Sequence, residues 1–217
     1  TFIAIDATAS HTVALDNIGD VWAWGDVSGG RAGSAASATP TKVLSGRTVV
    51  AVAAGTTNTI AVSSTGAVWV TGSGAEGQLG RGSTTDAADF TTASPWATTI
   101  TANSPAYAKS GPVRFASIAA GGSNTAAIDS NGHLWMWGAG LDGMNGLGTN
   151  TNSLTAALVS SAARFTSVSV GLRTVLATTS DGAVWAWGSG INAGNGRTFD
   201  TRLPQRMSIV GSYSIVA

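Results

Sequence analysis

The residues Gly-Ala-Val-Trp-Ala-Trp-Gly at positions 182–188 carry a pattern that the chain repeats. Gly-Asp-Val-Trp-Ala-Trp-Gly stands at 19–25, and Gly-His-Leu-Trp-Met-Trp-Gly stands at 132–138. A degenerate copy occupies 66–72, where Thr71 replaces the second tryptophan. The copies begin 47, 66 and 50 residues apart. A period in this range predicts a solenoid, a propeller or a related array.

Two further strands are predicted ahead of each tryptophan stretch. An apolar-spaced segment opens each repeat, at 2–7, 49–54, 115–120 and 165–170. A glycine follows it (Gly55, Gly121 and Gly171, with Thr8 in the first copy), always eleven residues before the glycine that opens the tryptophan stretch. A glycine there suits a positive φ or a close approach between strands. The second strand fills the interval and ends in turn residues such as Asn-Gly and Asp-Gly, which favour hairpins.

The tryptophans predict sheets that are packed on both faces. In a strand Trp22 and Trp24 share one face and small residues take the other. Because the rings recur at equivalent positions, a core role is favoured over aromatic-ligand binding for Trp22, Trp24, Trp69, Trp135, Trp137, Trp185 and Trp187. A glycine-rich connection follows, and a fourth strand is expected at 40–43 and 204–207, where a leading proline suits an edge strand. The predicted fold is all-β, with four-stranded antiparallel blades.

Together these motifs resemble the RCC1 (regulator of chromosome condensation) repeat, including Gly-Gln-Leu-Gly-x-Gly, which only residues 77–82 keep intact. The resemblance implies a seven-bladed β-propeller for the parent of this chain. We expect one repeat domain over 1–217, with repeats at about 1–47, 48–114, 115–164 and 165–211 and a partial fifth at 212–217. The chain is thus expected to be part of a longer array, or to pair its last strand with another chain. Open ends would expose strand edges, which favours self-association.

Composition excludes several classes of partner. Eleven basic and eleven acidic side chains cancel, and without a basic stripe we expect no nucleic-acid binding. No apolar run approaches the ~18 residues of a membrane span. The absence of cysteine excludes disulfides and thiolate metal sites. A surface of Thr, Ser, Asn and Gly with two lysines favours an extracellular or particle-surface setting, and a cytoplasmic one stays open.

Catalytic and cofactor sites are not expected. Residues 72–77 and 138–143 match the dinucleotide fingerprint G-x-G-x-x-G, but no helical pattern follows, so both are predicted to be turns. His11 and His133 occupy different repeat positions with no histidine at ligand spacing, so no metal is expected. Glu76 is the only glutamate, which leaves little for a paired-carboxylate site. A Ser-His-Asp triad stays open, because its members need not be close in sequence.

An insertion at 83–112 breaks the period of the second repeat. Long loops commonly carry function, and aromatic residues anchor partners, so Phe90, Trp96 and Tyr107 with Asp89 are the predicted partner-binding residues. A loop folded back on its own blade is the open alternative.

The predicted function is a non-enzymatic binding module that docks a protein or glycan through a blade face and this loop. The alternative is a structural, decoration or adhesion protein of a cell surface or virus particle. The resemblance also raises a small-GTPase exchange factor, which the neutral charge disfavours.

Overall fold

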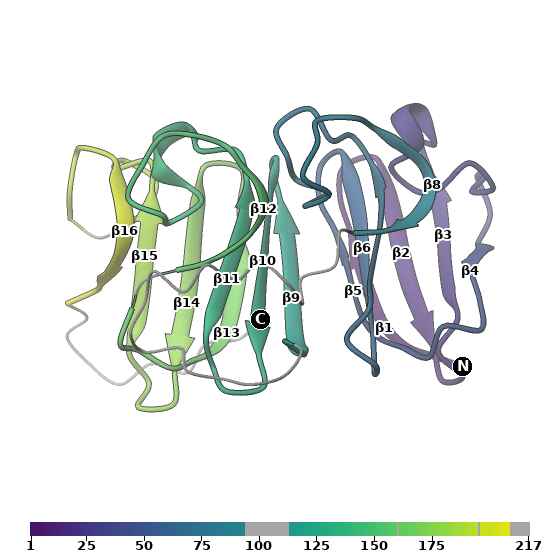
Figure 1. Ribbon diagram of the computed structural model, residues 1–217, viewed down its shortest axis with the longest axis horizontal. Coiled ribbons are helices and arrows are strands. Elements are labelled where there is room, and N and C mark those ends of the chain that lie inside the picture. The colour runs from purple at the N-terminus through teal and green to yellow at the C-terminus, as the bar shows by residue number, and fades with distance from the viewer. Residues whose placement is uncertain (94–112, 160, 195, 209–217) are drawn as a thin grey trace.

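The computed structural model describes residues 1–93, 113–159, 161–194 and 196–208, and shows four sheets of four antiparallel strands each (Figure 1). The first sheet contains β1 (Phe2–Ala7), β2 (His11–Asp16), β3 (Val21–Gly25) and β4 (Thr41–Leu44). The second contains β5 (Val49–Ala54), β6 (Asn58–Ser63), β7 (Val68–Gly72) and β8 (Ala87–Thr92). The third contains β9 (Phe115–Gly121), β10 (Asn124–Asp129), β11 (Leu134–Gly138) and β12 (Ser153–Leu158). The fourth contains β13 (Phe165–Val170), β14 (Thr174–Thr179), β15 (Val184–Gly188) and β16 (Thr201–Arg206).

Each sheet is a meander, because its strands neighbour one another in sequence order. The first strand of each later sheet packs against the first two strands of the sheet before it: β5 on β1 and β2, β9 on β5 and β6, and β13 on β9 and β10. The first and fourth sheets therefore lie at opposite ends of a row (Figure 1). This is the arrangement of propeller blades, and the predicted all-β blade architecture is confirmed.

Carboxylates at the start of the hairpin hold the turn between the second and third strands. Oδ1 of Asp16 accepts hydrogen bonds from the amides of Ile18 (3.1 Å) and Asp20 (2.9 Å). Asp129 does the same in the third blade, accepting from the amides of Asn131 (2.8 Å) and His133 (3.0 Å). These aspartates belong to the turns, as their positions in the sequence predict.

The second tryptophan of the third strand ties neighbouring blades together. Trp137 and Trp187 are fully buried. Their Nε1–H groups donate to the carbonyl oxygens of Gln78 and Met144 in the preceding blade, each at 2.9 Å. Thr71, which replaces this tryptophan in the second blade, donates its hydroxyl to the Gly30 carbonyl at 2.6 Å. A polar link to the preceding glycine-rich connection is thus kept even where the ring is lost.

The first tryptophan of the third strand packs on the residue that opens the blade. Its ring meets an aromatic ring edge-on in three blades, with centroid distances of 5.9 Å for Phe2–Trp22, 6.3 Å for Phe115–Trp135 and 6.0 Å for Phe165–Trp185. Edge-to-face contacts of this kind add to the hydrophobic gain of burial.

Within the described part of the chain, the Nε1–H donors of these first tryptophans have an acceptor in two of the four blades. Asp16 and Asp129 accept from Trp22 (2.8 Å) and Trp135 (3.3 Å). Ser63 and Thr179 stand at the equivalent positions of the second and fourth blades. There the buried Nε1 atoms of Trp69 and Trp185 have no hydrogen-bond partner among the described residues.

Two sequence predictions need correction. The fourth strand of the last blade was predicted at 204–207 with a leading proline, whereas β16 runs from Thr201 to Arg206 and holds Pro204 inside it. β16 pairs on one side only, with β15, so an edge strand tolerates the missing amide. Of the two reasons offered for a glycine at 55 and 121, positive φ fails at both positions and close approach holds. A Cβ on Gly121 would lie 1.9 Å from the Val170 carbonyl oxygen, so close approach explains the glycine.

Candidate docking face

Two sets of loops gather at the same end of every blade, here called the loop end. Because neighbouring strands run antiparallel, the links from first to second strand and the glycine-rich connections from third to fourth strand leave the sheet on the same side. The turns between second and third strands lie at the other end. In Figure 1 the loop end is uppermost. It is the part of the molecule where residues of different blades converge outside the core.

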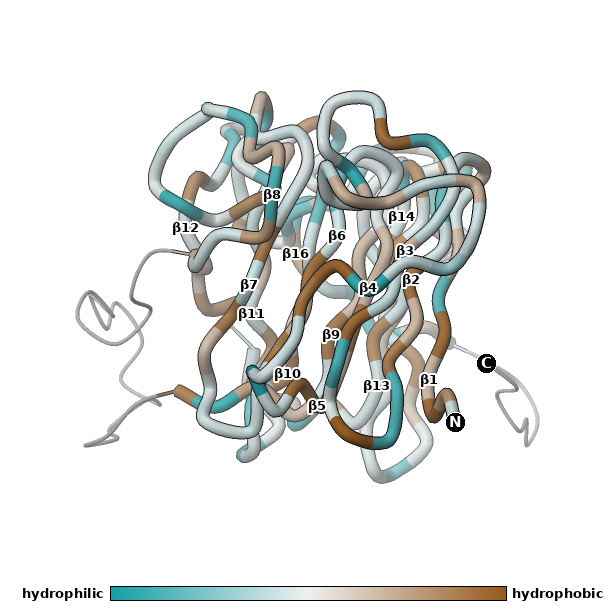
Figure 2. The backbone as a smooth tube through the Cα atoms, turned by 90° about the vertical axis from the view of Figure 1, so that its right-hand side faces the viewer, coloured by the Kyte–Doolittle hydropathy of each residue, from teal (hydrophilic) through white to brown (hydrophobic). Residues whose placement is uncertain are grey.

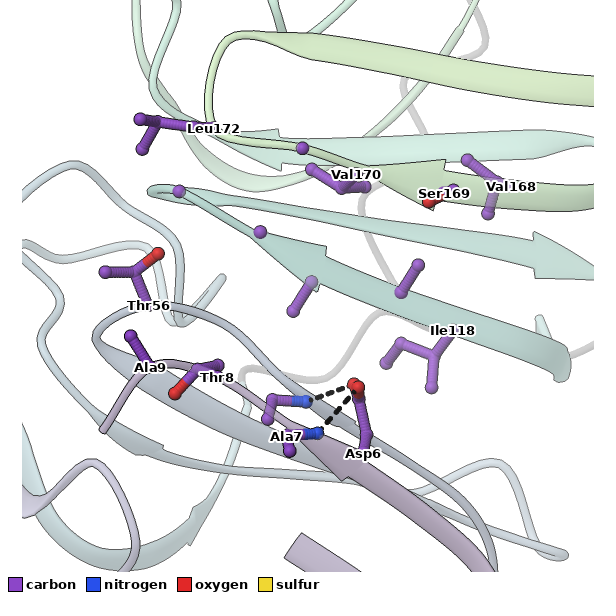
Figure 3. Close-up of a pocket in the computed structure, with 16 residues that line it drawn as sticks. Asp6, Ala7, Thr8, Ala9, Thr56, Ile118, Val168, Ser169, Val170 and Leu172 are labelled. Atoms are coloured by element: carbon purple, nitrogen blue, oxygen red, sulfur yellow. Dashed lines mark hydrogen bonds between the residues drawn. The ribbon is translucent and has the colours of Figure 1, made fainter. Parts of the chain in front are cut away.

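An inner depression of about 460 Å³ lies at the loop end of the first strands (Figure 3). Its lining comes from all four blades, with Asp6, Thr56, Gly121 and Leu172 as examples. The Asp6 carboxylate accepts from the backbone amides of Ala7 (2.9 Å) and Ala54 (2.8 Å), so it links the first two blades. Each oxygen of this carboxylate thus accepts one backbone hydrogen bond, which gives Asp6 a structural role.

Backbone forms much of the wall of this depression. A Cβ at Gly122, whose φ is 53°, would lie 2.9 Å from the Leu172 carbonyl oxygen. Together with Gly121 this brings the β9–β10 link against the link that follows β13. The remaining wall carries apolar and hydroxyl side chains, such as Ile118, Val168 and Thr56, so a ligand here would meet both peptide groups and these side chains.

A second depression of about 310 Å³ adjoins the first and shares Thr56, Gly122 and Leu172 with it. Leu141 and Leu172, on connections of the third and fourth blades, are 66% and 73% exposed. At the rim Arg173 donates from Nε to Oδ2 of Asp142 at 2.8 Å. An exposed apolar patch bordered by an ion pair is typical of protein contact surfaces.

The two histidines lie in different parts of the fold, and each contacts residues of its own surroundings. His11 is buried, with Nε2 2.9 Å from the Thr59 hydroxyl and Nδ1 3.1 Å from the Thr8 hydroxyl. Burial, and secondly the positive charge of Arg31, lower the pKa of His11 below its usual value. His133 contacts the Asp129 carboxylate at 3.1 Å, away from the loop end. Within the described ranges no cluster of three or more His, Asp or Glu could hold a metal ion.

The described residues of the insertion hold blades together. The Asp89 carboxylate accepts from the Ser34 amide at 3.0 Å, linking the second blade to the first. Phe90 is half-buried and packs against the core between those blades. Trp96 and Tyr107 lie outside the described residues. The partner-binding role proposed for these four residues stays a prediction.

β8, in the described part of the insertion, runs from the loop end towards the other end of the second blade. β8 ends at Thr92 and β9 begins at Phe115, both at the end that carries the turns between second and third strands. The flanking residues Ala93 and Val113 are buried in the core between the second and third blades. Neither Asp89 nor Phe90 lines either depression.

The two glycine-rich fingerprints are turns. The first segment, 72–77, begins at the last residue of β7 and contains no helix. The second, 138–143, begins at the last residue of β11 and ends with η2 (Leu141–Gly143), which is one turn of 3-10 helix. Neither provides the α-helix N-terminus that a dinucleotide pyrophosphate requires. Sequence reasoning missed Leu141 and Leu172, although for Leu141 a large apolar residue in a Gly-, Asp- and Asn-rich connection is itself a signal.

Solved structures with this fold share it over almost the whole chain. Human WBSCR16 is 23% identical with a TM-score of 0.77, covering 96% of this chain and 53% of that protein. Prp20p from Saccharomyces cerevisiae is 20% identical with a TM-score of 0.80, covering 96% and 50%. Yeast RCC1 (Prp20) bound to Kap60 is 19% identical with a TM-score of 0.79, covering 96% and 49%. The chain thus spans about half the length of these proteins, and the likeness shows the fold alone.

No curated protein is similar enough in sequence to count as a match. Among the described residues, no helix has the length and apolar character needed to span a membrane. Two family models describe the regulator of chromosome condensation (RCC1) repeat. One matches residues 2–29, 49–78 and 115–143, and the other matches residues 65–128. Since these matches together cover more than half of the residues, the chain belongs to the RCC1 repeat family.

Proposed function

We propose that the chain is a non-enzymatic module that binds a protein at the loop end of its blades. The exposed pair Leu141 and Leu172 beside the second depression carries this proposal, because large apolar side chains in solvent mark contact surfaces. Two yeast structures of the same fold have titles that describe binding of Prp20p to Gsp1p and histones, and of yeast RCC1 to Kap60. Those partners are properties of those proteins, and they support the class of ligand only.

A protein suits this surface better than a glycan or a nucleic acid. Glycan sites need polar side chains that converge on the ligand. In the second depression the charged residues Asp142 and Arg173 bond to each other, and the strongly exposed lining residues include Leu141 and Leu172. Nucleic-acid sites need concentrated positive charge, and the chain has no net charge. The expected structural, adhesion and exchange-factor roles and the extracellular setting gain no support from the comparisons and stay predictions.

The insertion is a separate proposed contact, since its described residues line neither depression. Trp96 and Tyr107 are the residues to test, because Phe90 already packs in the core between blades. Replacing Phe90 by alanine should lower the thermal midpoint. Replacing Trp96 and Tyr107 together should weaken partner binding and leave the midpoint nearly unchanged. Loss of stability with intact partner binding would assign the loop a structural role instead.

The docking face is tested with surface variants that should fold normally. The double variant L141S/L172S removes the two exposed leucines, and Ile18→Ser, at an exposed turn on the other end of the first blade, is the matched control. Cross-linking with mass spectrometry on the natural host extract should find partners for the wild-type chain and the control that the double variant loses. Equal recovery by all three, at equal thermal midpoints, would overturn the proposal.

A further inference from the structure

Large apolar side chains interrupt the loop end where the third and fourth blades meet. Figure 2 shows that the chain at this end, uppermost in the view, is mostly neutral to hydrophilic. Leu141, three residues after the glycine that ends β11, and Leu172, the second residue of the link between β13 and β14, are nevertheless strongly exposed. The second blade carries Ala75 and Thr56 at the same positions. The fold therefore does not require a leucine at either place.

Arg202 is a third departure from the repeat at the same junction. It is the second residue of β16, and the second residues of β8 and β12 are Ala88 and Leu154. A Cβ on Gly143 would lie 2.7 Å from Cγ of Arg202, so the arginine stem covers this glycine of the preceding blade. Leu154 covers Gly77 in the same way, with Cδ2 at 2.7 Å. An aliphatic stem is enough for this packing, so the fold does not account for the guanidinium group.

Unlike Arg173, Arg202 has no acidic partner among the described residues. Arg173 donates from Nε to Oδ2 of Asp142 at 2.8 Å, and this ion pair cancels the two charges. Arg202 is exposed, and the five ion pairs of the described chain do not include it. Its positive charge is therefore available to a ligand.

A third depression, of about 330 Å³, lies beside Arg202. Its charged lining, as far as the chain is described, consists of Arg197, Arg202 and Asp200, which leaves a net positive charge. The Asp200 carboxylate already accepts from the Gly190 amide at 3.2 Å. An acidic group is therefore the better electrostatic complement of this depression.

η2 joins the positive depression to the apolar docking face. Leu141, its first residue, lines the second depression, and Arg202, which covers its last residue Gly143, lines the third. Leu172 faces the second depression from the fourth blade. We call Leu141, Leu172 and Arg202 the junction site. It combines an apolar contact with one unpaired positive charge.

We propose that the junction site binds a protein segment that carries a large apolar side chain and, a few residues away, one or more carboxylates. The apolar side chain packs on Leu141 and Leu172, and a carboxylate accepts hydrogen bonds from the guanidinium group of Arg202. A basic segment would meet a like charge there and is rejected. This class of partner rests on the proposed function, because it concerns the same docking face.

Selection from a random library of short peptides tests the preference directly. The wild-type chain should enrich peptides that combine a large apolar residue with aspartate or glutamate. Arg202→Glu should shift the enrichment towards lysine and arginine. Arg206→Glu is the matched control, because it reverses an exposed arginine at the other end of the same strand. It should select the same peptides as the wild type.

The affinity of one selected peptide isolates the contribution of the arginine. Arg202→Leu gives β16 the residue that β12 has at Leu154, so the packing on Gly143 is kept. This variant should bind the peptide about two- to fivefold more weakly than the wild type does, at an equal thermal midpoint. It should lose nothing against a peptide whose acidic residues are replaced by their amides. High salt should reduce the difference between the two proteins.

The absence of any enriched peptide, or enrichment without carboxylates, would overturn the acidic preference. Equal affinity of the wild type and Arg202→Leu would do the same, and so would binding that the L141S/L172S variant retains. The docking face itself is judged separately, by the cross-linked partners that L141S/L172S loses. A face that keeps those partners while its selected peptides ignore Arg202 would support the proposed function and reject the acidic segment.

Discussion

In each blade the last residue of the second strand decides whether the Nε1–H group of the first tryptophan on the third strand has a hydrogen-bond acceptor. Asp16 and Asp129 reach the Nε1–H groups of Trp22 and Trp135 while still holding the turn amides. Serine and threonine are too short to reach, so Trp69 buries an unpaired donor, as Trp185 does. A buried donor without a partner costs about 1–3 kcal/mol.

Ser63→Asp should therefore stabilise the protein by about 1 kcal/mol, or raise the thermal midpoint by about 2–4 °C. The new carboxylate would keep the bond that Ser63 accepts from the Ala67 amide at 3.0 Å and would add the Trp69 donor. Arg47, stacked 4.5 Å from the Trp69 ring centroid, supplies a nearby positive charge. The variant Ser63→Asn offers an uncharged acceptor of the same length, so comparing it with Ser63→Asp separates the effect of the hydrogen bond from the effect of the negative charge. A midpoint unchanged or lowered in Ser63→Asp, measured by calorimetry, would contradict this account.

His11 makes stability depend on pH. Burial, followed by the charge of Arg31, holds its pKa in the folded chain below the ordinary value of 6.5. The unfolded chain therefore binds the proton first, and stability is lost as the pH falls below about 6.5. Aspartates with lowered pKa values, such as Asp26, change the stability only at more acidic pH.

His11→Asn tests this, because Asn58 and Asn124 stand at the equivalent positions. Thermal midpoints measured at about pH 7.5 and about pH 5 should differ less for the variant than for the wild type. An equal drop in the two proteins would show that another group causes the acid sensitivity.

At the scale of elements, the third strand organises both its own blade and the contact with the preceding one. Its first tryptophan packs on the opening residue of the same blade, and its second bonds to the previous glycine-rich connection. The blades therefore share polar links as well as an apolar interface.

Trp187→Phe should cost more stability than Trp185→Phe on the same strand, β15. Both changes remove the same ring atoms. Only Trp187→Phe also removes a hydrogen bond, because Trp187 donates to the Met144 carbonyl whereas Trp185 has no acceptor among the described residues. The fuller burial of Trp187 adds to the difference, which we expect to be at least about 1–3 kcal/mol. Denaturant unfolding of the two variants measures it. Equal losses would mean that the link between blades contributes nothing net.

The sequence predicts the first three strands of each blade well because glycines fix the hairpins at constant spacing. It places the last strand badly, since β16 has no alternating pattern and its register shifts between Ala186 and Gly188. It does not predict the docking face at all. Leu141 and Leu172 meet there only because the packing of neighbouring blades brings their loops together, which no local pattern encodes.

The whole molecule carries no net charge, and this predicts its behaviour towards polyanions. Of the five ion pairs found in the described chain, four use arginine or lysine and tie up part of the few cations present. We expect no binding to duplex DNA at about 50 mM salt, where basic proteins bind strongly. Fluorescence anisotropy with a labelled duplex measures this. Saturable, salt-sensitive binding would show a basic surface that the charge distribution does not predict.

The burial of Ala93 and Val113 on either side of the insertion has a consequence for its replacement. Both flanks are fixed in the core between the second and third blades, and neither lines the depression beside Leu141 and Leu172. A chain shortened between these two anchors should therefore keep the docking face, so that any partner it loses can be assigned to the replaced segment.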